Sequence, residues 1–208
     1  VSALGHDVAS FWSNLLDGRC GIQSIRRFDV TGYDCHIAAE VRDFDPTPAF
    51  PSPKEVRRTD RFVHFAVHAG WQALRDSGLD LDRCDRDRIG AFIGIGGLET
   101  TEGQHEVLLN RGPGRVSPFM IPMLILNMGA GMFSIYHNLR GPCVATCSAC
   151  ATSNHALGEA WRTIKMGDAD VLFAGGSEAT IVPFGVAGFF PTEALRTPND
   201  TPPTTSRP

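Results

Sequence analysis

The feature of this chain that most constrains its fold is a strand–helix–strand run across residues 144–174. Residues 144–146 and 171–174 predict two short strands, and a helix between them ends at Gly167. The run therefore predicts an α/β layer that encloses this helix between other elements. The side chains predicted on its buried face are Ala149, Ala156, Leu157, Ala160, Trp161 and Ile164.

Predicted helices and strands also follow one another in other parts of the chain. The sequence predicts a short amphipathic helix at 7–17, a strand at 37–41, a strand at 89–95, a helix at 99–109 and a turn at 112–114. A longer helix begins at Thr59 or Asp60 and ends at Ser77, because Asp and Thr cap helices and Gly78 stops them. Its predicted buried face consists of Phe62, Val63, Ala66, Ala69, Ala73 and Leu74.

The glycine-rich run IGIGGLE lies at the end of the strand at 89–95. It has neither the dinucleotide-binding spacing nor the Gly-Lys-Ser/Thr ending of a P-loop. Tight packing between strand and helix is therefore predicted instead of phosphate binding. The methionine-rich segment 123–139 is typical of a core or a subunit interface.

The composition argues against several classes of function. The 208 residues include 19 basic and 23 acidic side chains, and the net charge of −4 gives no general attraction to nucleic acid or anionic membrane. No apolar stretch approaches the roughly 18 residues that span a bilayer, and no leader opens the chain. A soluble, cytoplasmic protein is expected. Val1 and the proline-rich residues 197–208 do not look like domain ends, so we expect a chain that is incomplete at both ends.

Three of the six cysteines, Cys143, Cys147 and Cys150, fall within eight positions. Cys150 is predicted in the first turn of the helix that follows the strand at 144–146. There the helix dipole and unpaired N–H groups favour the thiolate, which is the form that attacks thioesters. The N–H of Cys150 can also contribute to an oxyanion hole. The alternative is an inert cysteine packed as a small hydrophobe.

The same cluster has the C-x3-C-x2-C spacing of enzymes that hold an iron–sulfur cluster, and His155 would extend it to a zinc site. Such sites need a loop around the metal, whereas Cys147 and Cys150 are predicted in structured backbone. We therefore assign no metal and no cofactor. His137 and His155 are expected to be core or surface residues.

Arg57, Arg58 and Arg61 crowd the start of the helix that ends at Ser77, where the helix dipole disfavours positive charge. This arrangement indicates an acidic partner. The alternative is that the arginines are solvated or paired with Glu55 and Asp60.

Several runs together carry a resemblance to a known family: FWSNLLDGRCGI, AAEVRDFDPT, RRTDRF, IGIGGLETTE, GPGRVSPFMIP, GPCVATCSACATSNHALGEAWRTIKMGDADV, and AGGSEATIVPFGVAGF with ALRTPNDTPPTTSRP. Over essentially all 208 residues the chain resembles the β-ketoacyl-acyl carrier protein synthases, the elongating ketosynthases of bacterial fatty-acid synthesis. The resemblance implies a thiolase-like fold with αβαβα layers, of which residues 1–208 form most of the amino-terminal half.

The resemblance also implies a chemistry. Cys150 is the family's nucleophile, which takes an acyl group from acyl carrier protein, whereas Cys143 and Cys147 have no catalytic role. Malonyl-acyl carrier protein then loses carbon dioxide, and the resulting carbanion attacks the acyl-enzyme in a decarboxylative Claisen condensation. The family's active-site histidines and lysine would lie beyond Pro208, so residues 1–208 alone are expected to be inactive.

Further roles follow from the resemblance alone. Thr101 and Phe189 would line the acyl pocket, and four basic residues would dock the acidic carrier: Lys54, Arg57, Arg58 and Arg115. A homodimer is implied for the complete protein. Acyl chain length stays open, because Thr101 stands where some relatives have a larger aliphatic side chain. The alternatives are a ketosynthase domain of a polyketide synthase, or a non-catalytic chain-length factor, which usually lacks the nucleophilic cysteine.

Overall fold

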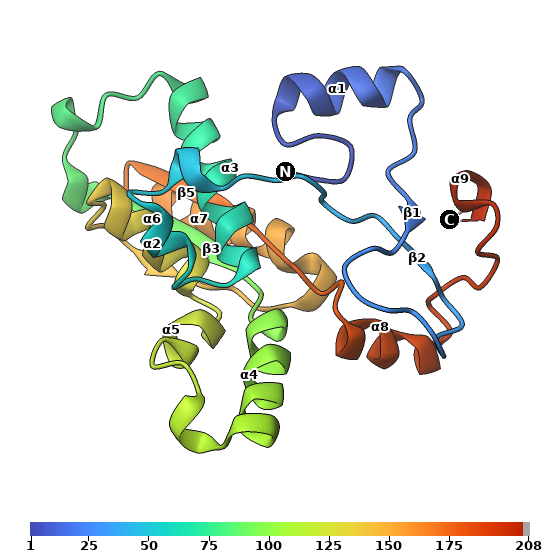
Figure 1. The fold of residues 1–208 in the computed structure, drawn as a ribbon. Coiled ribbons are helices and arrows are strands. Elements are labelled where there is room, and N and C mark those ends of the chain that lie inside the picture. Colours follow the sequence, from blue (N-terminus) through green and yellow to red (C-terminus); the bar gives the residue numbers. More distant parts are fainter. Residues whose placement is uncertain (206–208) are drawn as a thin grey trace. The chain divides into compact units, whose positions relative to one another are not determined.

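The computed structural model describes residues 1–205; Ser206 to Pro208, the end of the last quoted run, lie outside them. The chain forms two compact units (Figure 1). The larger unit is Pro46–Ala179, and the smaller one combines Val1–Asp45 with Thr180–Pro208. No helix within the described residues is long and apolar enough to cross a membrane.

The larger unit is built on a three-stranded parallel sheet. Its order is β4 (Cys143–Val144), β3 (Ile89–Gly94) and β5 (Val171–Gly176). β3 pairs with β5 from Ile89 opposite Val171 to Gly94 opposite Gly176, and every residue of β3 is buried. The predicted α/β layer is confirmed, and the structure shows that its strands are parallel. The strand predicted at 144–146 is shorter and begins one residue earlier, because β4 is an edge strand that leaves the sheet after Val144.

Helices cover both faces of this sheet, since strand side chains alternate between them. Ile89, Ala91 and Ile93 of β3 pack with α3 (Arg61–Ser77) and α6 (Met128–His137) in one apolar cluster. Phe92 belongs to a second cluster with Ala156 and Ala160 of α7 (Thr152–Met166). The larger unit is thus an α/β/α sandwich.

Helix α3 begins and ends where the sequence predicts. The Asp60 carboxylate accepts the N–H of Phe62 at 3.0 Å, and Gly78 ends the helix at φ +66°. The second Asp60 oxygen accepts the N–H of Thr100 at 2.8 Å, so one buried carboxylate holds the starts of two helices.

Part of the predicted buried face of α3 is wrong, because Ala69 and Ala73 are exposed. Val67 and Gly70 are buried instead. A Cβ at Gly70 would lie 2.7 Å from the Phe133 ring, so the helix turns its smallest residue toward α6 to admit that ring.

Helix α7 is not enclosed as predicted. Its residues Thr152, Ala156 and Ala160 are buried against the sheet. The prediction is wrong for Ala149, which lies before the helix, and for three side chains that we call the outer face of α7: Leu157, Trp161 and Ile164, with exposures of 55%, 65% and 42%. Small residues let the helix approach the sheet closely, and this turns the large ones outward.

The remaining helices of the larger unit are short, apart from α4 (Leu98–Arg111), which confirms the predicted 99–109 helix. The others are α2 (Pro53–Val56), α5 (Met120–Leu124), η1 (Thr47–Ala49), η2 (Leu81–Arg83), η3 (Arg86–Arg88), η4 (Pro113–Arg115) and η5 (Ala149–Ala151). The short η4 turn occupies the predicted turn at 112–114.

The smaller unit contains α1 (Val8–Leu16), which confirms the predicted 7–17 helix and is capped by Asp7. Its other elements are the antiparallel pair β1 (Gln23–Ser24) and β2 (Ile37–Ala38), followed by α8 (Pro183–Phe189), η6 (Phe190–Thr192) and α9 (Pro202–Thr205). Helix α1 has no buried residue. Asn199 accepts the N–H of His36 at 2.7 Å and donates to the carbonyl of Asp34 at 2.9 Å, which ties the two chain segments of this unit together.

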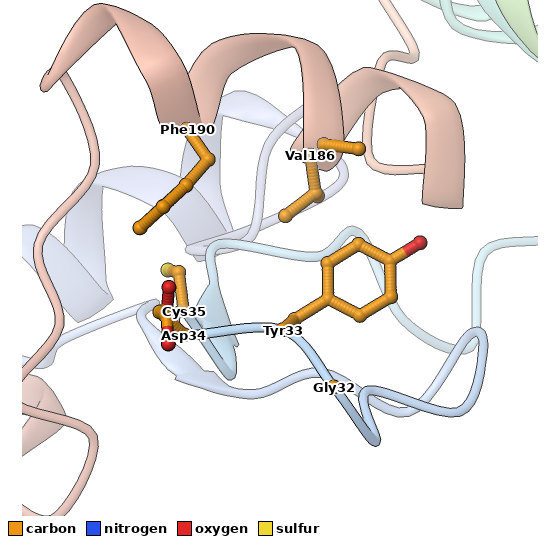
Figure 2. A pocket seen from close by; sticks show the side chains of 7 residues that line it. Gly32, Tyr33, Asp34, Cys35, Val186 and Phe190 are labelled. Carbon is orange, nitrogen blue, oxygen red and sulfur yellow. The ribbon is translucent and has the colours of Figure 1, made fainter.

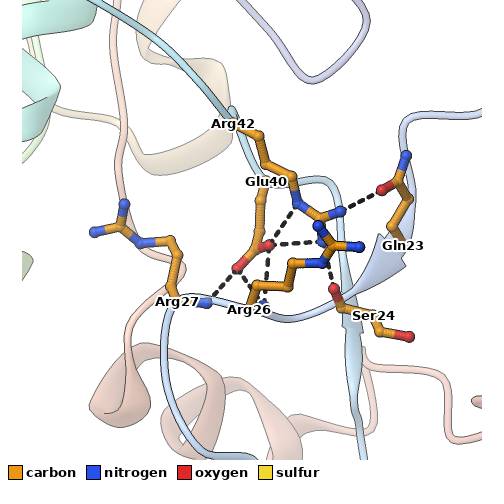
Figure 3. A network of polar contacts seen from close by, with 6 residues as sticks. All are labelled: Gln23, Ser24, Arg26, Arg27, Glu40 and Arg42. Atoms are coloured by element: carbon orange, nitrogen blue, oxygen red, sulfur yellow. Dashed lines mark hydrogen bonds and ion pairs between the residues drawn. The ribbon is translucent and has the colours of Figure 1, made fainter.

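A buried carboxylate ends β2 earlier than the predicted strand at 37–41. Glu40 accepts the N–H groups of Arg26 and Arg27, each at 3.0 Å, and pairs with the Arg42 guanidinium at 2.8 Å (Figure 3). Burial acts to raise the pKa of Glu40, but these donors outweigh it and leave the pKa lowered. The backbone around Glu40 is therefore organised by its side chain and not by a strand ladder.

Candidate active site

Cys150 lies in the short η5 turn between β4 and α7, with an exposed side chain and a free thiol. The predicted first turn of the helix is thus slightly wrong, since α7 begins two residues later at Thr152. No side chain caps α7, whose N-cap is Ala151. An exposed sulfur therefore sits beside an uncapped helix start, which is a suitable place for a nucleophile that attacks a thioester.

The backbone around the cysteine turns sharply. We call residues 146–152 the Cys150 turn. Ala149 has φ +48°, in the left-handed region that residues with a side chain seldom adopt. The N–H of Ala151 donates to the carbonyl of Ser148 at 3.0 Å, and the N–H of Ser148 donates to Thr152 Oγ1 at 2.9 Å. The turn is thus closed by hydrogen bonds on both sides of Ala149.

Glycines at the ends of two strands bring this turn against the sheet. A Cβ at Gly94 would lie 1.8 Å from the carbonyl oxygen of Thr146, and one at Gly176 would lie 2.6 Å from Ser153 Oγ. The turn therefore packs at the carboxyl ends of parallel strands, which is where α/β sheets place their sites.

The glycine-rich run IGIGGLE serves close packing, as predicted. Gly96 adopts φ +139°, and a Cβ there would lie 1.9 Å from the Phe62 ring. A Cβ at Gly97 would lie 2.4 Å from the carbonyl oxygen of Leu124. These glycines admit neighbouring groups of the protein itself.

Cys143 and Cys147 are also exposed free thiols. Among the described residues, no group of three or more histidine, cysteine or acidic side chains is arranged to hold a metal ion. His155 is a surface residue of α7, as one of the two predicted alternatives has it. Its Nδ1 lies 3.2 Å from Ser148 Oγ and its Nε2 lies 4.0 Å from Glu159 Oε1.

The two residues predicted to line an acyl pocket lie in different units. Thr101 is half-buried on α4, and its hydroxyl donates to the carbonyl of Gly97 at 2.7 Å. Phe189, in the smaller unit, is 50% exposed at the end of α8.

Sequence reasoning missed a cavity of about 250 Å³ in the smaller unit (Figure 2). Phe190, and not Phe189, lines it, together with Gly32, Tyr33, Asp34, Cys35, Val186 and Ala187. Nothing in the local pattern at 32–35 indicates that it meets α8.

The four predicted docking cations are not equivalent. Lys54 and Arg57 are exposed on and just after α2, and Arg115 is exposed in η4. Arg58 is half-buried: its guanidinium bonds Glu55 at 3.1 Å and lies 4.5 Å from the centre of the Phe119 ring. The alternative in which these arginines pair with Glu55 is thus confirmed for Arg58. Asp60, the other acidic partner expected, uses its two carboxylate oxygens to accept backbone N–H groups.

Comparisons with known proteins agree with this architecture. Residues 1–208 match the family model described as the beta-ketoacyl synthase N-terminal domain. A curated relative from Coxiella burnetii, "3-oxoacyl-[acyl-carrier-protein] synthase 2", is 44% identical over 100% of this chain and 50% of its own length. The chain spans about half the length of the curated relatives it matches.

Solved structures give the same picture. A beta-ketoacyl synthase from Burkholderia phymatum is similar with a TM-score of 0.87 and 30% identity, over 100% of this chain and 52% of that one. The ishigamide ketosynthase/chain length factor is similar with a TM-score of 0.79 and 27% identity, over 94% of this chain and 49% of that one. These neighbours bear out the expected thiolase-like fold class.

Proposed function

The chain belongs to the β-ketoacyl synthase family, and on that premise we propose that residues 1–208 are the amino-terminal domain of an elongating ketosynthase of fatty-acid synthesis, with Cys150 as the acyl acceptor. The observation that carries the proposal is the placement of Cys150. Its thiol is exposed in a hydrogen-bonded turn at the carboxyl end of the sheet, directly before α7.

The chemistry of this residue is thioester exchange. The Cys150 thiolate attacks the carbonyl carbon of an acyl thioester, and the acyl group becomes attached to Cys150 as the bond to the donor sulfur breaks. The departing donor thiolate takes up the proton that the Cys150 thiol released to solvent. Malonyl-acyl carrier protein then loses carbon dioxide, and its carbanion attacks the acyl-Cys150 carbonyl. The bond to the cysteine sulfur breaks, which yields β-ketoacyl-acyl carrier protein and a Cys150 thiolate, and this thiolate takes up a proton from solvent to restore the free thiol.

The proposed partner is acyl carrier protein, in keeping with the name of the Coxiella relative. Among the four basic residues, exposure favours Lys54, Arg57 and Arg115 as its docking cations. The Phe119 ring packs against Arg58, which directly follows Arg57 in the chain. Arg115 precedes Phe119 by only four residues, so the chain that leaves η4 runs to the segment next to α2. Arg58 has a structural role in this proposal, because Glu55 and Phe119 already engage its charge.

Three further assignments belong to the proposal. Thr101 and Phe189 line the acyl pocket of the complete enzyme. The enzyme works in the cytoplasm, and it does so as a homodimer. The hydroxyl of Thr101 is bonded to the backbone, so its methyl group is the part available to an acyl chain.

The test is acyl transfer to the full-length protein from acyl-acyl carrier protein, followed by mass spectrometry of the peptide that contains residues 143–152. We expect the acyl group on Cys150 and no acylation in Cys150→Ser. Cys147→Ser is the matched control, because Cys147 is equally a free and exposed thiol of the same segment, and it should acylate normally. Acylation that survives Cys150→Ser and disappears with Cys147→Ser would refute the assignment.

A further inference from the structure

Thr152 is a buried residue beside an exposed nucleophile. Its relative exposure is 2%, although Cys150 lies only two positions earlier and is exposed. A buried hydroxyl that lacks a partner is costly, so a buried threonine is normally hydrogen-bonded. The partners of Thr152 therefore show what this side chain holds in place.

Both partners of Thr152 belong to the Cys150 turn. The N–H of Ser148 donates to Thr152 Oγ1 at 2.9 Å. The hydroxyl of Thr146 donates to the carbonyl of Thr152 at 3.3 Å. The first residue of α7 is thus fastened to the residues that precede Cys150 in the chain.

The turn needs such a fastening. Ala149 lies at φ +48°, a conformation that is strained for a residue with a side chain and persists only where neighbouring contacts hold it. Ala149 stands between Ser148 and Cys150, so the hydrogen bond to Ser148 holds the strained residue on one side. Loss of that bond would let Ala149 rotate out of the strained conformation, and such a rotation would move Cys150.

A second contact to Ser148 is weaker. His155 Nδ1 lies 3.2 Å from Ser148 Oγ, but this pair is exposed and competes with water. The bond to Thr152 is part-buried and its acceptor belongs to a buried side chain, and a hydrogen bond is electrostatically stronger where less water reaches it. His155 therefore provides a control that touches the same serine.

We propose that Thr152 is a positioning residue for Cys150: its hydroxyl holds the strained turn so that the sulfur keeps the orientation needed for acyl transfer. The proposal rests on the function proposed above for Cys150. It concerns the Thr152 oxygen, and not the packing of its methyl group.

The experiment compares Thr152→Val, Thr152→Ser and His155→Ala in the full-length protein. Valine keeps the shape of threonine but cannot accept the Ser148 N–H. We expect single-turnover acylation of Cys150 at saturating acyl-acyl carrier protein to slow about tenfold in Thr152→Val, because a displacement of about 1 Å can cost up to 10²-fold. The KM for the donor should stay within twofold of wild type. Thr152→Ser and His155→Ala should acylate within twofold of the wild-type rate.

Hydrogen exchange reports on the tether itself. The Ser148 amide should exchange up to about tenfold faster in Thr152→Val than in wild type, because the loss of one hydrogen bond corresponds to at most about this factor. It should exchange at the wild-type rate in Thr152→Ser. If Thr152→Val does not fold, Thr152→Ala takes its place, because alanine also lacks the acceptor and is smaller.

Two results would overturn the proposal: acylation at the wild-type rate in Thr152→Val, or an equal loss in Thr152→Ser, which would implicate the methyl group. A wild-type protein that never acylates Cys150 would instead refute the proposed function. In that case alkylation of Cys150 by iodoacetamide decides the role of Thr152. A rate at least threefold lower in Thr152→Val and unchanged in Thr152→Ser supports it, and equal rates in all three proteins refute it.

Discussion

Of the four cations proposed to dock the carrier, Lys54, Arg57 and Arg115 are exposed, whereas Arg58 is engaged by Glu55 and Phe119. The change is the double charge reversal Lys54→Glu and Arg57→Glu in the full-length protein. Both side chains are exposed, so the substitutions should leave the fold intact. Arg58 is left unchanged, since Glu55 and Phe119 already hold its guanidinium.

The magnitude follows from exposure. An exposed ion pair contributes about 0.2–1 kcal/mol, and reversal replaces each attraction with a repulsion of similar size. Two reversed sites should therefore weaken carrier binding by about 0.8–4 kcal/mol at low ionic strength, or about 4- to 900-fold in Kd. At 1 M salt the Debye length is about 3 Å, so the difference should fall below about twofold.

The assay is fluorescence anisotropy of labelled acyl carrier protein across a salt series. Arg83→Glu with Arg162→Glu is the matched control, because it changes the net charge equally through two other exposed arginines. The control should lose at most about twofold. Unchanged affinity in the Lys54 and Arg57 variant at low salt would refute the docking site. An equal loss of affinity in the control would show that binding depends on the net charge of the protein and not on the position of these two cations.

Four further predictions concern the larger unit. Asp60→Ala should destabilise the protein by about 2–5 kcal/mol in chemical unfolding, because two buried N–H groups lose their acceptor; a change under about 0.5 kcal/mol would contradict this. Gly94→Ala should lower the thermal midpoint by several degrees through overpacking against backbone, whereas Gly175→Ala, which meets nothing within 4 Å, should not. Burial lowers the pKa of His64, so as the pH falls the unfolded state takes up a proton before the folded state does, and the free energy of unfolding should decrease below about pH 6.5. In urea titrations His64→Gln should make the free energy of unfolding less dependent on pH. An unchanged pH dependence in this variant would refute the role of His64. Residues 1–208 expressed alone should bind a hydrophobic dye through the outer face of α7 and make no β-ketoacyl product; a dye-free, active fragment would contradict both expectations.

Local signals in the sequence determined the elements themselves. The bounds of α3 follow from Asp60 and Gly78, because capping and the left-handed stop involve only neighbouring backbone groups. The sequence also indicated β3, α4, the strand–helix–strand order and the close packing of the IGIGGLE glycines. The predicted position in the first turn of a helix and the resemblance together singled out Cys150 among three neighbouring cysteines.

Only the tertiary structure decided which faces and side chains are engaged. An apolar helix stripe does not specify which of its residues meets the sheet, so Leu157, Trp161 and Ile164 were wrongly expected inside. Arg57 and Arg58 are adjacent and chemically alike. The Arg58 guanidinium packs on the ring of Phe119, which lies 61 residues later in the chain, and Arg57 does not share this contact. The Ser148–Thr152 bond also depends on the left-handed turn at Ala149, which no local signal predicts. Contacts between residues distant in the chain arise when elements pack together. The sequence pattern of one helix or strand does not specify which other element lies beside it.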